Sequence, residues 1–165
     1  MLRTTLAGLA LTLIAGTVSA HGFKLGALEI GHPYAIETAP GAPTAAGYLT
    51  ITNTGSDPDR LIAVEADFPR VQIHETEIDA SGVARMRHIE ALELPPGATV
   101  SLQPRGTHVM FMGLTEPLEE GAKIDATLVF EGAGAVAVQF NVEPRAAGAD
   151  AETDPETESM DHTGH

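Results

Sequence analysis

The chain has 165 residues, which is the length of one domain of ordinary size. It contains no cysteine, which excludes disulfides, thiolate zinc sites and blue-copper electron transfer, so any metal site must be built from His, Met, Asp, Glu and backbone groups. The formal net charge of −14 argues against nucleic acid and anionic membranes as partners, because both favour basic protein surfaces.

The first twenty residues predict a secretory signal peptide. They contain one basic residue near the start, an apolar run over residues 6–14 that is too short to span a bilayer, and the small-residue sequence VSA at 18–20. We expect cleavage after Ala20, so that the exported protein begins at His21 in the periplasm. No later stretch approaches the ~20 apolar residues of a membrane span, so we expect no stable membrane insertion.

Residues 21–143 predict an all-β domain, because short alternating runs are separated by turn sequences such as NTGSDPD, DASG, LPPGA and QPRGT. Many short strands at this spacing favour an antiparallel β-sandwich or a Greek-key barrel. The predicted strands cover residues 23–30, 34–38, 46–53, 59–66, 71–78, 83–94, 99–102, 108–113, 123–130 and 135–142.

The last segment, residues 144–165, differs in composition from the body. It has six acidic residues and no lysine or arginine after Arg145, and almost no apolar residue other than alanine. Such a segment cannot bury enough apolar surface to offset its chain entropy. We therefore predict a disordered acidic tail.

The turn sequence DASG lies between two alternating runs within residues 71–90, which predicts a β-hairpin. If the hairpin turns near Ala80, His74 lies directly opposite Met86 on one face. Their Cβ atoms would then be about 4.5–5.5 Å apart. A shift of one residue would separate them, so this pairing is a testable prediction.

A second group of soft ligands occurs in GTHVMFMGL, where His108, Met110 and Met112 take alternate positions of one strand and therefore share a face. Thioethers favour Cu(I), and imidazoles bind several transition metals including copper. Zinc would call for cysteine, a third histidine or a carboxylate, and calcium or magnesium for oxygen ligands. Each of these residues alone is better explained by core packing or a solvated strand face than by metal binding.

The joint spacing of His74, Met86, His108 and Met110 resembles the H(M)x10Mx21HxM signature of the periplasmic copper chaperones called PCu(A)C. Where that pattern allows a second methionine after the first histidine, this chain has Glu75. The stretches LEIGHPYA, AAGYLTITNTG, LPPG and VMFMGL are also similar, so the resemblance extends over about residues 24–142.

The resemblance implies a cupredoxin-like β-barrel that holds Cu(I) at one exposed end, with His74, Met86, His108 and Met110 as ligands. It also implies a partner, because proteins of that family pass periplasmic copper to cytochrome c oxidase, in particular to the CuA site of subunit II; another copper-assembly protein is the alternative acceptor. Met112 and His88 are candidate auxiliary ligands, with core packing or a solvated face as the alternative reading.

Two further places suggest a second site for Cu(II). The tail ends with Met160, His162 and His165 among carboxylates, a composition typical of metal binding, although a merely solubilising tail explains it equally. If His21 is the new N-terminus, its amino group and imidazole offer a chelate for Cu(II); a frayed terminus with an ordinary histidine is the alternative.

We therefore expect a copper carrier and not an enzyme. One alternative is copper sequestration for tolerance, which the same site would serve. Another is a copper oxidoreductase that uses His21, against which the absence of tryptophan and the presence of only two tyrosines count. No nucleophile elbow, phosphate-binding loop or zinc-protease motif is present in the sequence.

Overall fold

The computed structural model describes residues 22–145, and within that range all regular structure is β-strand. The predicted signal peptide, His21 and the predicted tail beyond Arg145 lie outside the described residues. The strands are β1 (Phe23–Leu25), β2 (Leu28–Ile36), β3 (Thr44–Asn53), β4 (Asp59–Ala66), β5 (Arg70–Ile78), β6 (Ala84–Ile89), β7 (Leu92–Leu94), β8 (Thr99–Leu102), β9 (Thr107–Met112), β10 (Lys123–Phe130) and β11 (Gly134–Glu143). Residues 22–145 contain no helix long and apolar enough to cross a membrane.

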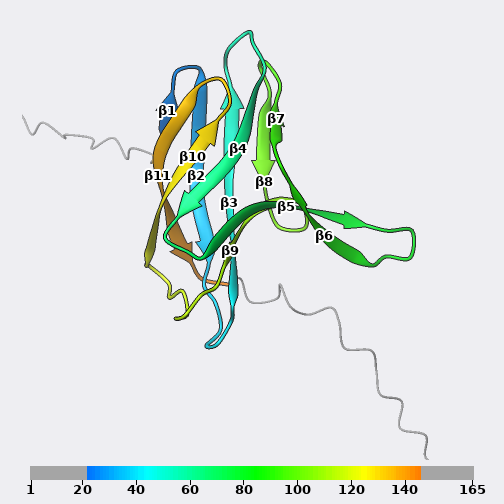
Figure 1. The fold of residues 1–165 in the computed structure, drawn as a ribbon, viewed down its shortest axis with the longest axis vertical. Coiled ribbons are helices and arrows are strands. Elements are labelled where there is room, and N and C mark those ends of the chain that lie inside the picture. The colour runs from blue at the N-terminus through cyan, green and yellow to red at the C-terminus, as the bar shows by residue number, and fades with distance from the viewer. Residues whose placement is uncertain (1–21, 146–165) are drawn as a thin grey trace, which may run out of the picture.

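The strands form a single sheet in the order β6-β5-β9-β3-β2-β11-β10-β4-β7, with β1 added to β2 and β8 added to β3. The pairs are antiparallel except for β11 with β2, and several connections pass over a neighbouring strand, as in Greek-key folds. The sheet curls so that its two halves face each other, while the end of the β5–β6 hairpin projects from the body (Figure 1). The prediction of an all-β fold is confirmed.

Two strand boundaries differ from the sequence-based expectation. The chain turns at Gly26, which has a φ of 58°, so β1 and β2 form a hairpin where one strand was predicted. At the expected break near Pro33, β2 instead continues through a bulge, where His32 takes a φ of 47° and the register with β3 shifts. A bulge absorbs the missing N–H of proline without ending the strand.

The strand predicted over residues 83–94 is split into β6 and β7. β6 pairs with β5 at one edge of the sheet, whereas β7 pairs with β4 at the other edge. One chain segment therefore serves both edges. Alternation along the sequence does not reveal this, because each half alternates in the same way.

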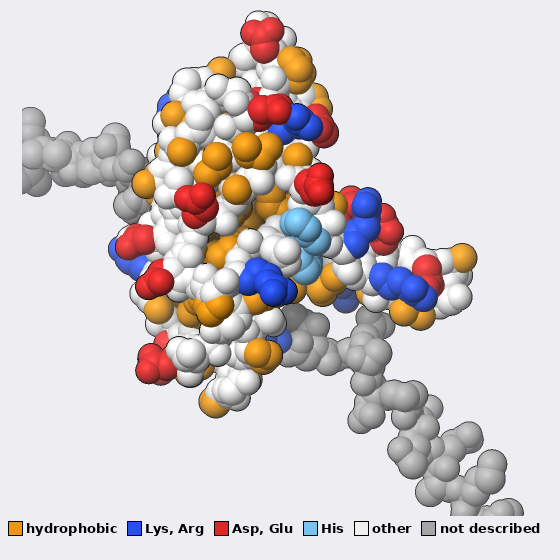
Figure 2. All heavy atoms as spheres, viewed as in Figure 1, with side chains coloured by type: hydrophobic (Ala, Val, Ile, Leu, Met, Phe, Trp, Pro, Cys, Tyr) orange, Lys and Arg blue, Asp and Glu red, His pale blue; other side chains and the backbone are white. Residues whose placement is uncertain are grey.

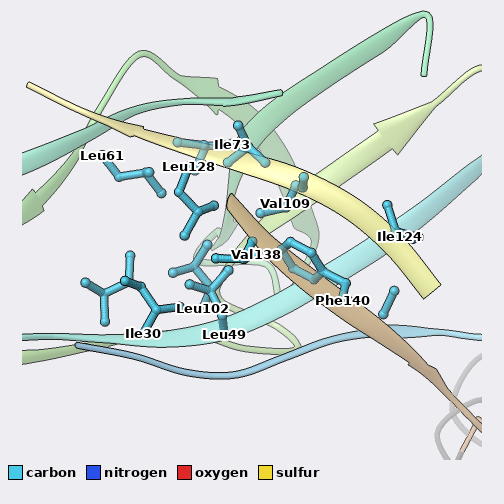
Figure 3. Close-up of a cluster of buried hydrophobic side chains, with 14 of the residues drawn as sticks. Ile30, Leu49, Leu61, Ile73, Leu102, Val109, Ile124, Leu128, Val138 and Phe140 are labelled. Carbon is cyan, nitrogen blue, oxygen red and sulfur yellow. The ribbon is translucent and has the colours of Figure 1, made fainter. Parts of the chain in front are cut away.

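The core is made by side chains that alternate strands direct inward. Figure 3 shows Leu49, Ile73, Val109, Leu128 and Phe140 meeting there from five different strands. All five are at most 3% exposed. Because side chains alternate between faces, burial of Ile73 and Val109 places the histidines that follow or precede them on the outer face of the sheet.

Candidate metal centre

The turn of the β5–β6 hairpin determines which side chains meet across it. The N–H of Asp79 donates to the carbonyl of Val83 at 3.0 Å, and the N–H of Gly82 donates to the carbonyl of Asp79 at 2.9 Å. The Asp79 carboxylate also accepts from the N–H groups of Ser81 and Val83. Gly82 has a φ of 81°, a left-handed conformation that suits glycine. The loop therefore has three residues and is centred on Ser81, not on Ala80.

This loop corrects the predicted pairing. His74 lies directly opposite His88, and Met86 lies opposite Thr76. The prediction that His74 faces Met86 is therefore wrong by two residues. Because an even shift keeps the side of the sheet, His74 and Met86 still share a face, now as diagonal neighbours with Cα atoms about 7–8 Å apart.

The other neighbour of β5 is β9, and their register brings the second His–Met pair alongside. His74 pairs with His108, and Gln72 pairs with Met110. Met112 pairs with Arg70, four residues along β5 from His74, so the structure does not bring it beside the histidines. Direct pairing of His74 with His108 was not part of the sequence-based prediction, because it depends on which strands are neighbours.

Three histidines thus form a row across three adjacent strands. The ring centroid of His74 is 6.1 Å from that of His88 on β6 and 6.1 Å from that of His108 on β9, and the interplanar angle is 56° in both pairs. Figure 2 shows histidine side chains at the surface where the hairpin leaves the body, with basic side chains nearby.

Solvent exposure increases along this row toward the hairpin. His108 is only 4% exposed, His74 and Met110 are partly buried, and Met86 is 60% exposed. His88 is also exposed. On the side of His108, therefore, the body of the protein covers the centre. On the side of Met86 and His88, the centre lies on the exposed, projecting hairpin.

The ring nitrogens of the two central histidines have different partners. Nδ1 of His108 lies 3.1 Å from the carbonyl oxygen of Gly106, which can only accept; in the neutral imidazole, therefore, Nδ1 carries the proton and Nε2 has the lone pair. Nε2 of His74 lies 3.2 Å from Oε1 of Gln72. That contact makes Nε2 the donor and leaves Nδ1 of His74 with a lone pair.

Nδ1 of His74 is the single buried side-chain nitrogen or oxygen without a hydrogen-bond partner among residues 22–145. A buried polar atom left unpaired costs about 1–3 kcal/mol. Burial lowers the pKa of His74, and the neighbouring His108 and His88 lower it further. The imidazole is therefore held neutral with a free lone pair, which is the form that binds a transition metal.

Glu75 does not join the centre. It lies on the opposite face of β5 from His74, where its carboxylate accepts from Nη2 of Arg87 at 2.8 Å. Nε of Arg87 donates to Glu77, also at 2.8 Å. Glu75, which replaces the second methionine of the signature, therefore links β5 to β6 on the face opposite the histidines.

The donor set limits which metal fits. In the described part of the chain, no group of three or more His, Cys, Asp or Glu side chains is gathered closely enough to hold a metal ion. An ion bound beside His74 and His108 would therefore need the thioethers on the same face, Met110 and Met86. Two imidazoles with thioethers are a soft, neutral set that suits Cu(I) better than zinc or calcium.

A groove of about 630 Å³ adjoins the centre on the outer face of β2 and β3. Its walls include Tyr34, Tyr48, Pro104, Met110 and Arg145. Met110 is therefore reachable from this groove as well as from the histidine row.

Three residues at the centre were not identified from the sequence. Gln72 lies two positions before His74 on the same face, so strand periodicity would have found it. The Gly106 carbonyl and Tyr48, whose ring centroid is 6.4 Å from that of His108, depend on loop conformation and strand order. Burial raises the pKa of the Tyr48 hydroxyl, so Tyr48 lies beside His108 as the neutral phenol.

The model of the LpqE-like family, described as putative lipoproteins, matches residues 28–142 of this chain. A putative lipoprotein of Leifsonia xyli subsp. xyli is 36% identical over 94 residues. That match spans 56% of this chain and 56% of the relative, so the chain corresponds to little more than half of the relative's length.

Solved structures of similar fold include PCuAC domains. The copper-bound PCuAC domain from PmoF2 is 33% identical, with a TM-score of 0.64, over 76% of this chain and 99% of that domain. The apo PCuAC domain from PmoF1 is 30% identical, with a TM-score of 0.65, over 76% of this chain and all of that domain. Apo-DR1885 from Deinococcus radiodurans, 24% identical with a TM-score of 0.58 over 88% of this chain and 98% of its own, shares the fold. The expected cupredoxin-like fold is confirmed, and the chain belongs to the LpqE-like family.

Proposed function

We propose that the protein is a periplasmic copper chaperone that binds Cu(I) through His74, Met86, His108 and Met110. The observation that carries the proposal is the His74–His108 pair: two adjacent imidazoles, each with one nitrogen free, one of these buried and without a partner. Thioethers on the same face complete a soft set. The copper-bound state of the similar PmoF2 domain supports copper as the cargo.

A carrier must release its ion, and the geometry suits release. The four ligands are neutral, so bound Cu(I) keeps its single positive charge and no ligand has to be protonated before it leaves. Met86 stands on the exposed hairpin, and Met110 borders an open groove. These features favour transfer by stepwise ligand exchange, with the CuA site of cytochrome c oxidase subunit II as the proposed acceptor.

Competition titration with a chromophoric Cu(I) chelator under reducing conditions tests the binding. We expect one tight Cu(I) site that is lost in the His108→Ala, Met110→Ala double variant. Met112→Leu is the matched control, because Met112 lies on the same strand and face but four residues from the histidine row along β5. Tight binding that survives in the double variant contradicts the proposal.

Delivery needs a separate measurement. The Cu(I)-loaded protein is mixed anaerobically with the reduced apo soluble domain of subunit II, the two are separated, and copper is measured in each. Copper that moves to the acceptor supports delivery. If copper stays with this protein when the acceptor is present in tenfold excess, the result would instead indicate sequestration.

A further inference from the structure

His88 is outside the four-residue signature, yet it occupies the position directly across from His74. Two imidazoles that bind one ion from opposite sides have ring centroids up to about 6.5 Å apart, given metal–nitrogen distances of about 2.0–2.1 Å. Both the His74–His88 and the His74–His108 separations, at 6.1 Å, are close to this value. By this measure His74 is placed equally well to share an ion with either neighbour.

The ligands around His74 therefore fall into two overlapping sets. The inner set is His74 with His108 and Met110, on β5 and β9 of the body. The outer set is His74 with His88 and Met86, on the hairpin. His88 and His108 lie on opposite sides of His74, which agrees with the absence of a gathered three-histidine cluster among the described residues.

The two sets differ in access. His108 is 4% exposed, so a docked protein cannot reach an ion through that side of the centre. His88 and Met86 are both exposed, two residues apart on one face of β6. Arg87 between them points the other way and is paired with Glu75 and Glu77, so His88 and Met86 lie on the face that carries His74.

We propose that His88 is an exchange ligand through which Cu(I) enters and leaves the centre, an inference that rests on the proposed function. As copper leaves, a bond from His88 to Cu(I) forms while the bonds from His108 and Met110 break, and His74 and Met86 hold the ion throughout. The ion then lies on the outer set, where an acceptor ligand replaces His88 in turn. Copper stays Cu(I), and the neutral ligands neither gain nor lose protons.

The test is the rate of Cu(I) transfer between the full chain and bicinchoninate, measured anaerobically by stopped flow in both directions. His88→Asn removes the imidazole and should slow release and loading by the same factor, about tenfold or more. The reason is that a ligand that binds copper only during transfer lowers the barrier in both directions and leaves the equilibrium affinity unchanged. His88→Met supplies another Cu(I) ligand and should restore the rates. His32→Asn is the matched control: His32 is exposed, pairs with Glu143 and lies off the row.

The outcomes separate the two claims. If His88→Asn transfers copper at the wild-type rate, the exchange role is wrong while the proposed function stands. If the variant instead loses affinity about tenfold and releases copper faster, His88 is a holding ligand and the inference is also wrong. If the wild type shows no Cu(I) binding that depends on His108 and Met110, the proposed function itself fails. Repeating the comparison with Met160→Leu, His162→Asn and His165→Asn excludes a contribution from these residues.

Discussion

Substitution of Gly47 by alanine should destabilise the barrel directly beneath the metal centre. Gly47 pairs with Val109 on β9. An added Cβ would lie 2.7 Å from Cε2 of Phe111 and 3.1 Å from Cε1 of Phe140. Both rings are fully buried and pack edge to face with centroids 5.5 Å apart, so neither can move aside into solvent.

Overpacking of this kind costs about 1–3 kcal/mol. The lower chain entropy of alanine in the unfolded state offsets about 0.4–1 kcal/mol of that cost. We therefore expect the free energy of unfolding to fall by about 1–2 kcal/mol and Tm to fall by roughly 4–8 °C for a domain of this size.

Urea and thermal unfolding of the Gly47→Ala variant measure this effect. Gly106→Ala is the control, because its Cβ would meet only ordinary contacts at 3.5 Å with Gln103. We expect the control to stay within about 0.5 kcal/mol of the wild type. If Gly47→Ala is no more destabilising than Gly106→Ala, the packing of β3 against Phe111 is not as described.

Three further substitutions test other parts of the structure. Asp59→Asn should lower the free energy of unfolding by about 1–2 kcal/mol at pH 7. Burial disfavours the charged carboxylate, but three backbone N–H donors outweigh burial and hold the pKa of Asp59 below its ordinary 3.8. This stabilisation is present above the ordinary pKa of the carboxyl and is lost as pH falls through its pKa in the folded protein. The difference in urea midpoint between the wild type and Asp59→Asn should therefore become smaller below about pH 4. A difference that does not change with pH refutes the reasoning. Asp79→Ala removes the carboxylate that accepts two N–H bonds in the hairpin turn. Hydrogen exchange at the Arg85 amide, which takes a hydrogen-bonded position opposite Glu77, should become about tenfold faster with little change in Tm. An equal acceleration across the body would show that the hairpin is not a separate unit. Met110→Leu should weaken Cu(I) binding by about tenfold or more in a competition titration, whereas Met112→Leu should leave it within about threefold; equal effects would mean that the register does not select the ligand.

Strand periodicity is enough to predict much of this fold. Alternation and turn residues identify most of the strands, and they place His108 and Met110 on one face because side chains two apart on a strand always share a face. Their common face is a local property. It does not depend on which strands become neighbours.

The register of the hairpin was predicted less well, for a local reason. A three-residue loop in this sequence can begin at Asp79 or at Ala80, and the Asp79 carboxylate together with left-handed Gly82 selects the second. The change of two residues preserves the face of Met86. It also brings His88 to the position where Met86 was expected.

The remaining features depend on tertiary structure. The pairing of β5 with β9 brings His74 beside His108, although 34 positions separate them in the chain. The tautomer of His108 is set by the Gly106 carbonyl in a loop, and the split of β6 from β7 follows from pairing at opposite edges of the sheet. None of these has a signature within a short stretch of sequence.

X-ray absorption of the Cu(I)-loaded protein tests the central claim most directly, because it counts the scatterers around copper. We predict two nitrogen and two sulfur neighbours in the wild type, with one sulfur lost in Met110→Leu and one nitrogen lost in His108→Ala. A copper environment of nitrogen and oxygen alone, unchanged by either substitution, would contradict the assignment of this centre.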